Sequence, residues 1–182
     1  MFCITLMAVA GVLLLRSLDR PKTLLPGTKT ISVVLDDNYP PYIFRDAEGK
    51  LQGILVDQWA LWSKTTGIKA ELHAMDWADA LDGMRAGKYD VIDTAFENEE
   101  RDTWLDFSDP YVTIDVPIYH NKEIGGITDA ASLIGFTVGV KAGDACIPIL
   151  QQAGVTNIAE YPSYEAVVDA AKSGEIGVFV VD

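Results

Sequence analysis

An aspartate and two tyrosines surround a pair of prolines in the segment Asp36-x-x-Tyr39-Pro40-Pro41-Tyr42, just after a short β-branched run. Because proline fixes its own backbone angle, we expect a rigid loop that presents both phenol rings. Open α/β sheets bind ligands in crevices outside the carboxyl ends of their strands, which is where this loop would lie. The segment therefore predicts rings that stack on a small molecule, although a structural turn with core aromatics explains it equally well.

Arg101 is a second candidate, because it follows the strand-like segment 90–95 and is the only arginine after Arg85. A guanidinium group just beyond a strand end can hold a carboxylate through two parallel hydrogen bonds. The alternative is an ion pair on a helix surface with Glu97, four residues earlier.

The third candidate is the segment 138–144, which reads VGVKAGD and indicates a strand, a glycine turn and the start of a helix. Free N–H groups at a helix start suit an anion. Asp144, however, would cap those groups itself and oppose an incoming carboxylate, so the segment favours a capped turn.

The familiar enzyme signatures GxSxG, GxxxxGK[ST], HExxH and CxxC do not occur in the sequence. His73 and His120 stand in predicted strands without a cysteine or serine partner nearby. Cys3 and Cys146 are the only cysteines, which excludes a disulfide framework and a cysteine metal site. We therefore predict no metal, no cofactor and no catalytic residue.

The composition is that of a folded globular protein, with 49% apolar and 23% charged residues in a chain of 182. The 14 basic residues are outnumbered by 27 acidic ones, which gives a formal net charge of −13. Such a surface repels phosphate backbones, so we expect no nucleic-acid partner.

Strand-like and helix-like segments alternate from residue 30 onward. The predicted strands are 31–35, 42–44, 68–75, 90–95, 112–120, 137–140, 157–161 and 176–181. The predicted helices are 54–66, 77–86, 97–103, a short one opening at Asp129 or Ser132, 144–153 and 164–172. The first helix carries an apolar stripe of Leu55, Trp59 and Trp62 with Ile54 and Leu61 alongside, and Asp76 is the expected N-cap of the second. Repeated strand–helix–strand units indicate an α/β fold with parallel sheets.

We divide the chain into a leader over 1–28, a first lobe over 29–114 and a second lobe over 115–182. Residues 2–15 are uncharged and almost wholly apolar, which favours a signal-peptide core or an uncleaved membrane anchor over a buried core helix. An exported, periplasmic or extracytoplasmic protein is therefore expected. Because the chain ends at Asp182 directly after an apolar strand, we expect the second lobe to be incomplete and the fold to be truncated at its C-terminus.

Several motifs in a fixed order resemble the family 3 extracellular solute-binding proteins, from about Thr30 to Asp182. They are the Asp36–Tyr42 loop and the segments GILVD (53–57), GKYDVI (87–92), LDFSDPY (105–111), GV (139–140) and VFVVD (178–182). The resemblance implies a two-lobed type II periplasmic-binding-protein fold with parallel-rich sheets. It also implies that a small solute lies in the cleft between the lobes, which close on it.

The resemblance assigns roles to five residues of this sequence. Tyr39 stacks on the ligand, Trp77 lines the cleft and Thr94 supplies a hydroxyl, while Arg101 holds an α-carboxylate and Asp182 takes the α-amino group. The complete expected ligand-binding set is Asp36, Tyr39, Tyr42, Trp77, Thr94, Arg101, Asp144 and Asp182.

Two residues depart from the amino-acid-binding members of the family. Phe96 replaces a second small hydroxyl residue, and Asp144 replaces the usual threonine of the second lobe. Both changes weaken the case for an ordinary α-amino acid and leave room for a cationic or otherwise atypical ligand.

The segments 93–94 and 114–118 also resemble the solute-binding domains of membrane-anchored signalling proteins such as diguanylate cyclases and sensor kinases. We therefore expect extracytoplasmic binding of a small, amino-acid-like solute for ABC-type uptake or for transmembrane signalling. The expected partners are an ABC permease or a fused or associated output domain, and the membrane through the N-terminal segment.

Two other functions stay open at this point. One is a fold-related enzyme, such as a cyclohexadienyl- or arogenate-type dehydratase with Glu97 or Asp144 as its cleft acid, or a regulatory module of a lytic transglycosylase. The other is an interaction domain that binds no ligand.

Overall fold

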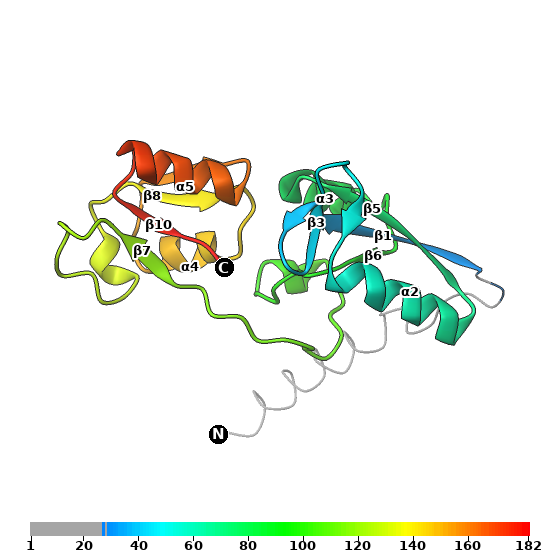
Figure 1. Ribbon diagram of the computed structural model, residues 1–182. Helices are drawn as coiled ribbons and strands as arrows, with labels where there is room; N and C mark the ends of the chain where they lie inside the picture. The colour runs from blue at the N-terminus through cyan, green and yellow to red at the C-terminus, as the bar shows by residue number, and fades with distance from the viewer. Residues whose placement is uncertain (1–26, 28) are drawn as a thin grey trace, which may run out of the picture.

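The computed structural model describes residue 27 and residues 29–182, which form two α/β lobes side by side (Figure 1). The predicted leader, apart from Gly27, lies outside the described residues. Within the described part of the chain, no helix is both long enough and apolar enough to cross a membrane.

The first lobe is built on a three-stranded parallel sheet in the order β5–β1–β6. The strands are β1 (Thr30–Asp36), β5 (Lys69–Met75) and β6 (Val91–Ile92). A small antiparallel sheet of β2 (Asn38–Tyr39), β3 (Ile43–Arg45) and β4 (Leu51–Gln52) follows β1. The helices are α2 (Ile54–Thr66), α3 (Trp77–Arg85) and the 3₁₀ turn η1 (Arg101–Thr103).

The second lobe has a four-stranded sheet in the order β7–β10–β8–β9. The strands are β7 (Ile118–His120), β8 (Val138–Lys141), β9 (Ile158–Tyr161) and β10 (Val178–Val180). β8 pairs in parallel with β9 and β10, whereas β7 runs antiparallel to β10. The helices are η2 (Ala131–Leu133), α4 (Cys146–Gln152) and α5 (Tyr164–Ser173).

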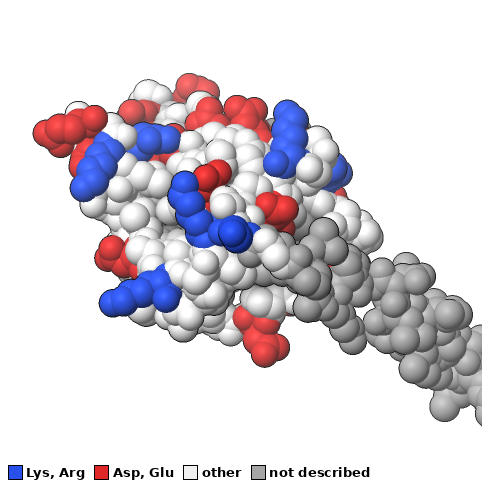
Figure 2. Space-filling model, turned by 90° about the vertical axis from the view of Figure 1, so that its right-hand side faces the viewer, with Lys and Arg blue, Asp and Glu red and all other residues white. Residues whose placement is uncertain are grey.

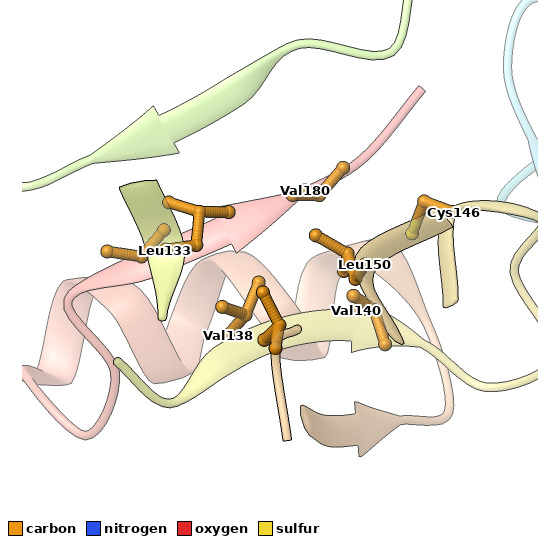
Figure 3. Packing of buried hydrophobic residues seen from close by; sticks show 8 residues of the cluster. Leu133, Val138, Val140, Cys146, Leu150 and Val180 are labelled. Atoms are coloured by element: carbon orange, nitrogen blue, oxygen red, sulfur yellow. The ribbon is translucent and has the colours of Figure 1, made fainter. Parts of the chain in front are cut away.

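The central strands β1, β8 and β10 of the two larger sheets are buried on both faces, as is typical of parallel sheets. In β1, Val33 and Leu35 pack into the cluster beneath α2, while Val34 packs against Trp77 and Ala80 of α3 on the opposite face. In the second lobe, β8 and β10 pack with the buried side of α4 (Figure 3). A separate cluster beneath α5 contains Val167, Ala170 and Ile176. Each lobe therefore has its own core.

The extended segment 112–117 connects the two lobes (Figure 1). Ile114 packs on the core of the first lobe, and Ile118 packs on the core of the second. The predicted domain boundary falls between these two contacts and stays a prediction.

Several predicted elements are shorter than expected. The strands predicted over 90–95 and 112–120 form a ladder only at Val91–Ile92 and Ile118–His120, and the helix predicted over 97–103 is only the turn η1. A strand exists only where a neighbouring backbone pairs with it, and the described residues offer no such neighbour to the remainder of these segments.

Two local predictions in the helices are wrong. Ile54 and Leu61 lie off the buried stripe of α2, with exposed fractions of 48% and 65%. Asp76 precedes α3, but its side chain does not cap the helix.

The charged side chains are interspersed on the face of the molecule shown in Figure 2, where lysines and arginines alternate with acidic residues. On that face, the net negative charge is not gathered into a single patch.

Candidate functional site: the cleft between the lobes

The candidate site lies where the two lobes meet at the carboxyl ends of their central strands. β1 ends at Asp36 and β8 ends at Lys141, and these two residues form an ion pair across the cleft. Because the carboxyl ends of parallel strands lie at one edge of a sheet, the loops after β1, β6 and β8 gather there. The cleft is therefore lined by loop residues from both lobes.

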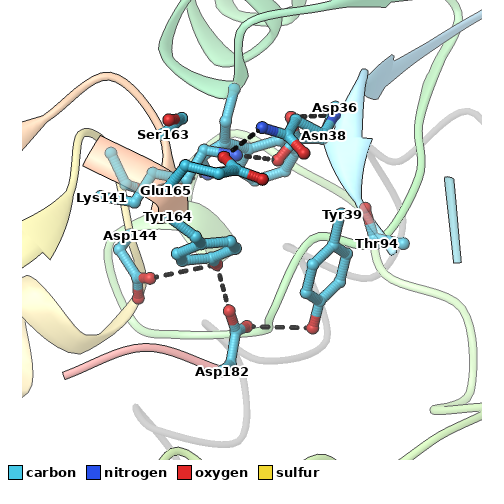
Figure 4. A network of polar contacts seen from close by, with 12 residues as sticks. Asp36, Asn38, Tyr39, Thr94, Lys141, Asp144, Ser163, Tyr164, Glu165 and Asp182 are labelled. Carbon is cyan, nitrogen blue, oxygen red and sulfur yellow. Dashed lines mark hydrogen bonds and ion pairs between the residues drawn. The ribbon is translucent and has the colours of Figure 1, made fainter. Parts of the chain in front are cut away.

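A chain of phenols and carboxylates runs through the cleft (Figure 4). The Tyr39 hydroxyl donates to Asp182 Oδ2 at 3.1 Å. The Tyr164 hydroxyl lies between two carboxylates, in contact with Asp182 Oδ1 and 3.4 Å from Asp144 Oδ2. Within residues 29–182, neither carboxylate forms an ion pair, and hydrogen bonds from Tyr39, Tyr164 and the Cys146 N–H are their direct contacts.

Burial raises the pKa values of Asp144, Tyr39 and Tyr164. Burial and then the neighbouring Asp182 raise the pKa of Asp144, against the opposing effect of the Cys146 backbone N–H, which donates to Asp144 Oδ1 at 2.8 Å. Burial and the nearby carboxylates also raise the pKa values of the Tyr39 and Tyr164 hydroxyls, which therefore stay protonated donors at neutral pH. The Asp144 contact confirms the capped turn expected from the sequence.

A buried ion pair joins the lobes beside this chain. The side chains of Asp36 and Lys141 are only 7% and 2% exposed. The Lys141 ammonium also lies 4.8 Å from the centre of the Tyr164 ring, within the range of a cation–π contact. Nearby, Asn38 Nδ2 of the first lobe donates to Glu165 Oε2 of the second at 2.6 Å.

Arg101 is buried at the base of the cleft, with an exposed fraction of 4%. Its two terminal nitrogens donate to the backbone oxygens of Phe96 and Gly143, each at 2.9 Å. Burial lowers the pKa of the guanidinium group, against the opposing effect of Asp144. The alternative of a helix-surface ion pair with Glu97 is wrong, because Glu97 is exposed and Arg101 points inward.

Gly143 lies in close contact with the first lobe. Its backbone oxygen accepts both from Arg101 and from the Trp77 indole N–H at 3.1 Å. Its φ of 75° is in the left-handed region, and an added Cβ would lie 3.0 Å from the Leu81 side chain and 3.5 Å from the Trp77 ring. A glycine is therefore required for this turn to reach α3.

The other two predicted residues, Thr94 and Tyr42, lie at the edge of the cleft. Thr94 has a φ of 63°, and its hydroxyl donates to the backbone oxygen of Asp93 at 2.6 Å. The Tyr42 ring lies 5.1 Å from the Tyr39 ring and packs on the core of the first lobe.

The cavity that remains between the lobes has a volume of about 20 Å³. It is lined by Asp36, Tyr39, Trp77, Thr94, Phe96, Arg101, Asp144, Ala145 and Tyr164. This volume suits a water molecule rather than an amino acid. An amino acid would therefore fit only if the lobes moved apart.

A larger cavity of about 340 Å³ lies beside the segment 107–114. Tyr42 and Thr94 are the only predicted site residues that line it. Its two acidic residues, Glu97 and Asp109, are exposed to solvent. It therefore lacks the buried charges that would hold a small polar solute.

Six of the eight predicted residues line the small cavity, and Tyr42 and Asp182 contact that set directly. Their role in binding stays a prediction. The sequence reasoning assigned no role to Lys141 or Tyr164. Lys141 is the last residue of β8, and Tyr164 is the first residue of α5, directly after the N-cap Ser163. Their positions at a strand end and at a helix start are the sequence signals that could have identified them.

The family of bacterial extracellular solute-binding proteins, family 3, matches residues 31–169. The L-cystine-binding protein TcyJ of Escherichia coli (strain K12) is 33% identical over 116 residues, which are 63% of this chain and 44% of TcyJ. The virulence sensor protein BvgS of Bordetella pertussis is 28% identical over 123 residues, which are 67% of this chain and 10% of BvgS.

The structure of an ancestral arginine-binding protein bound to arginine is 30% identical, with a TM-score of 0.74. The match covers 85% of this chain and 70% of that protein. The chain thus spans less than half the length of TcyJ and about two thirds of the ancestral protein's length. The two-lobed α/β arrangement predicted from the sequence is confirmed.

Proposed function

Because the chain belongs to the bacterial extracellular solute-binding proteins of family 3, we propose that it binds a small, amino-acid-like solute in the cleft between its two lobes. The observation that carries this proposal is the charge arrangement of the cleft. A buried guanidinium group, Arg101, lies in the same small cavity as Asp144, and Asp182 is joined to Asp144 through Tyr164. A zwitterionic solute presents the complementary pair of charges.

The proposed roles of the cleft residues follow from the hydrogen-bond donors and acceptors that their side chains carry. Arg101 holds the solute carboxylate once the lobes separate and its bond to Gly143 is released. Asp182 accepts hydrogen bonds from the solute ammonium, with Asp144 beside it. The Tyr39 and Trp77 rings form apolar walls above and below the aliphatic part of the solute.

The proposed output of binding is the movement of the lobes. TcyJ is named as a cystine-binding protein and BvgS as a sensor, so both transport and signalling occur among the relatives. Solute binding would hold the lobes together for recognition by an ABC permease, or by an output domain fused to or associated with this chain. Attachment to the membrane through the N-terminal segment is part of the same proposal.

The relatives described above are binding and sensor proteins, which supports a binding role over a catalytic one. An enzymatic role would require a cleft acid that stays protonated near neutral pH. Glu97 does not meet this requirement, because it lies outside the cleft. Of the two acids considered from the sequence, Asp144 is the one that lies in the cleft, where burial raises its pKa.

A thermal-shift panel tests the proposed function. Amino acids, amines and organic acids are added to the purified protein, and a ligand at about 100 times its Kd stabilises the folded state by about 2.7 kcal/mol. For a protein of this size that is a rise in Tm of about 5–10 °C. Arg101→Ala should abolish the rise.

Arg85→Ala is the matched control for this panel. Arg85 pairs with the exposed Glu100 and lies over the Trp104 ring, outside the cleft, so its loss should leave the ligand-induced shift intact. A panel that gives no shift, or a shift that survives Arg101→Ala unchanged, would contradict the proposal.

A further inference from the structure

The ion pair between Asp36 and Lys141 has no part in the proposed binding of a zwitterion. It crosses from the end of β1 to the end of β8, and both side chains are almost fully buried. A buried charge is costly unless it is paired, so each of these residues requires the other while the lobes are in contact. Asp36 also lines the small cavity, which places its carboxylate within the space that a solute would enter.

The charges of the cleft do not balance. The carboxylates that line or contact the small cavity are Asp36, Asp144 and Asp182, and its two cations are Lys141 and Arg101. A fourth carboxylate, Glu165, is exposed at the edge of the cleft and bonds to Asn38. Because Lys141 forms an ion pair with Asp36, this carboxylate is not available to bind a cationic group of the solute. The acids that remain for a solute cation are Asp144 and Asp182. Both contact the Tyr164 hydroxyl, whereas the Lys141 ammonium lies over the Tyr164 ring (Figure 4).

Building on the proposed function, we propose that Lys141 is a specificity-determining residue. By forming an ion pair with Asp36, it prevents that carboxylate from binding a second cation and so disfavours solutes with a cationic side chain. A second cation directed toward Asp36 would lie beside the Lys141 ammonium in a water-poor cleft, where like charges repel strongly. A solute with one ammonium group finds its partners in Asp144 and Asp182 and does not compete with Lys141.

The inference predicts a change in selectivity when Lys141 is removed. L-arginine and L-glutamine are suitable probes, because both side chains are polar and only that of arginine is charged. The difference in their length is the same for every variant and therefore cancels when their affinity ratios are compared. Calorimetric titration gives the Kd of each probe for the wild type and for Lys141→Met. With Asp36 left unpaired, the preference for arginine over glutamine should rise at least tenfold in Lys141→Met.

Two control variants separate charge from structure. Lys141→Arg keeps the cation and should keep the wild-type preference. Lys172→Met removes an exposed lysine of α5 and should change nothing, because that side chain is 73% exposed. A loss of packing alone would weaken the binding of both probes equally and would leave the ratio of their Kd values constant.

Asp36→Asn provides the test should Lys141→Met fail to fold. It leaves Lys141 without its acid, so the preference for arginine over glutamine should fall below that of the wild type. A ratio that stays constant in the folded variants, with binding retained, overturns the role of Lys141 and leaves the proposed function intact. An absence of binding to the whole solute panel by the wild type and every variant overturns the proposed function and this inference together.

Discussion

Asp144 is the residue whose ionisation opposes folding most directly. Its carboxylate is buried, its pKa is raised above the usual 3.8, and no described cation forms an ion pair with it. A group with a raised folded-state pKa contributes stability below its unfolded pKa and loses that contribution as the pH rises through the folded pKa. The charged form present at neutral pH therefore destabilises the folded protein.

Asp144→Asn should consequently raise the Tm at pH 7, since the amide is uncharged and its oxygen can still accept from the Cys146 N–H. The gain should shrink as the pH falls through the folded-state pKa and should disappear below the unfolded pKa of 3.8, where the wild-type carboxyl group becomes protonated in both states. Thermal unfolding of both proteins from pH 3.5 to 8 measures the difference. Asp169→Asn is the control, because it makes the same substitution at a carboxylate that is exposed on α5. A difference that is constant across the pH range would contradict the assignment.

The site residues differ in how far the sequence predicts them. Asp36, Tyr39 and Arg101 are close in sequence to proline, strand-end and turn signals, so their positions were predicted. Lys141 could not be assigned a role, because its partner Asp36 is 105 positions away in the chain and only the folded lobes bring them together. The paired state of a buried charge is a property of the tertiary structure.

At the scale of elements, the start of α2 is fixed against the loop that carries the tyrosines. Gly53 precedes α2 with a φ of 119°, and a Cβ placed there would lie 2.3 Å from the backbone oxygen of Tyr42. The Leu55 N–H donates to the same Tyr42 oxygen at 3.0 Å. The helix therefore positions the loop containing Tyr39 through backbone contacts that only glycine permits.

Gly53→Ala should destabilise the first lobe, both because alanine is strained at this φ and because its Cβ cannot avoid the backbone of Tyr42. Strain of this kind costs about 1–3 kcal/mol, and the clash adds to it. Urea unfolding measures the loss. Gly49→Ala is the matched control, since Gly49 has a φ of 80° but nothing within 4 Å of an added Cβ. Equal losses in the two variants would show that the close approach to Tyr42 contributes nothing.

Helices were predicted more accurately than strands for a physical reason. α2 and α5 are bounded by local signals, which are the left-handed C-caps Gly67 and Gly174 and the Ser163 side chain that accepts from the Ala166 N–H. β6 and β7 are shorter than their β-branched sequences suggest, because the extent of a strand depends on its neighbour in the sheet. The apolar residues of segment 112–117 instead belong to the connection between the lobes.

At the scale of the whole molecule, the two lobes have separate cores and meet through polar contacts and through the Tyr164 ring, which packs against the core of the first lobe. Besides the Asp36–Lys141 ion pair, hydrogen bonds join Asn38 to Glu165, Tyr39 to Asp182, and Trp77 and Arg101 to Gly143. Water can replace each of these bonds when the lobes separate, so the net free energy of closure is small compared with that of either core. Opening therefore requires no loss of structure within a lobe.

This arrangement predicts an unusual response to the loss of the buried ion pair. Removing one partner of a buried pair inside a single core costs about 3–5 kcal/mol, because the other charge stays unpaired. In Asp36→Asn the lobes can separate instead, so that water hydrates Lys141. We expect the radius of gyration to increase in small-angle X-ray scattering without added solute, while the Tm falls by less than the cost of a broken core pair would imply.

Ile31→Val is the control for this experiment, because it lies in the same strand but acts only on the core of the first lobe, where Ile31 is 3% exposed. It should lower the free energy of unfolding by about 0.5–1.5 kcal/mol and leave the radius of gyration unchanged. If Asp36→Asn lowered the Tm while the scattering curve stayed the same as that of the wild type, the lobes would be held together by contacts other than the buried pair. The solute would then have to open the cleft against those contacts, and the ion pair would determine the stability of the closed form without controlling access to the site.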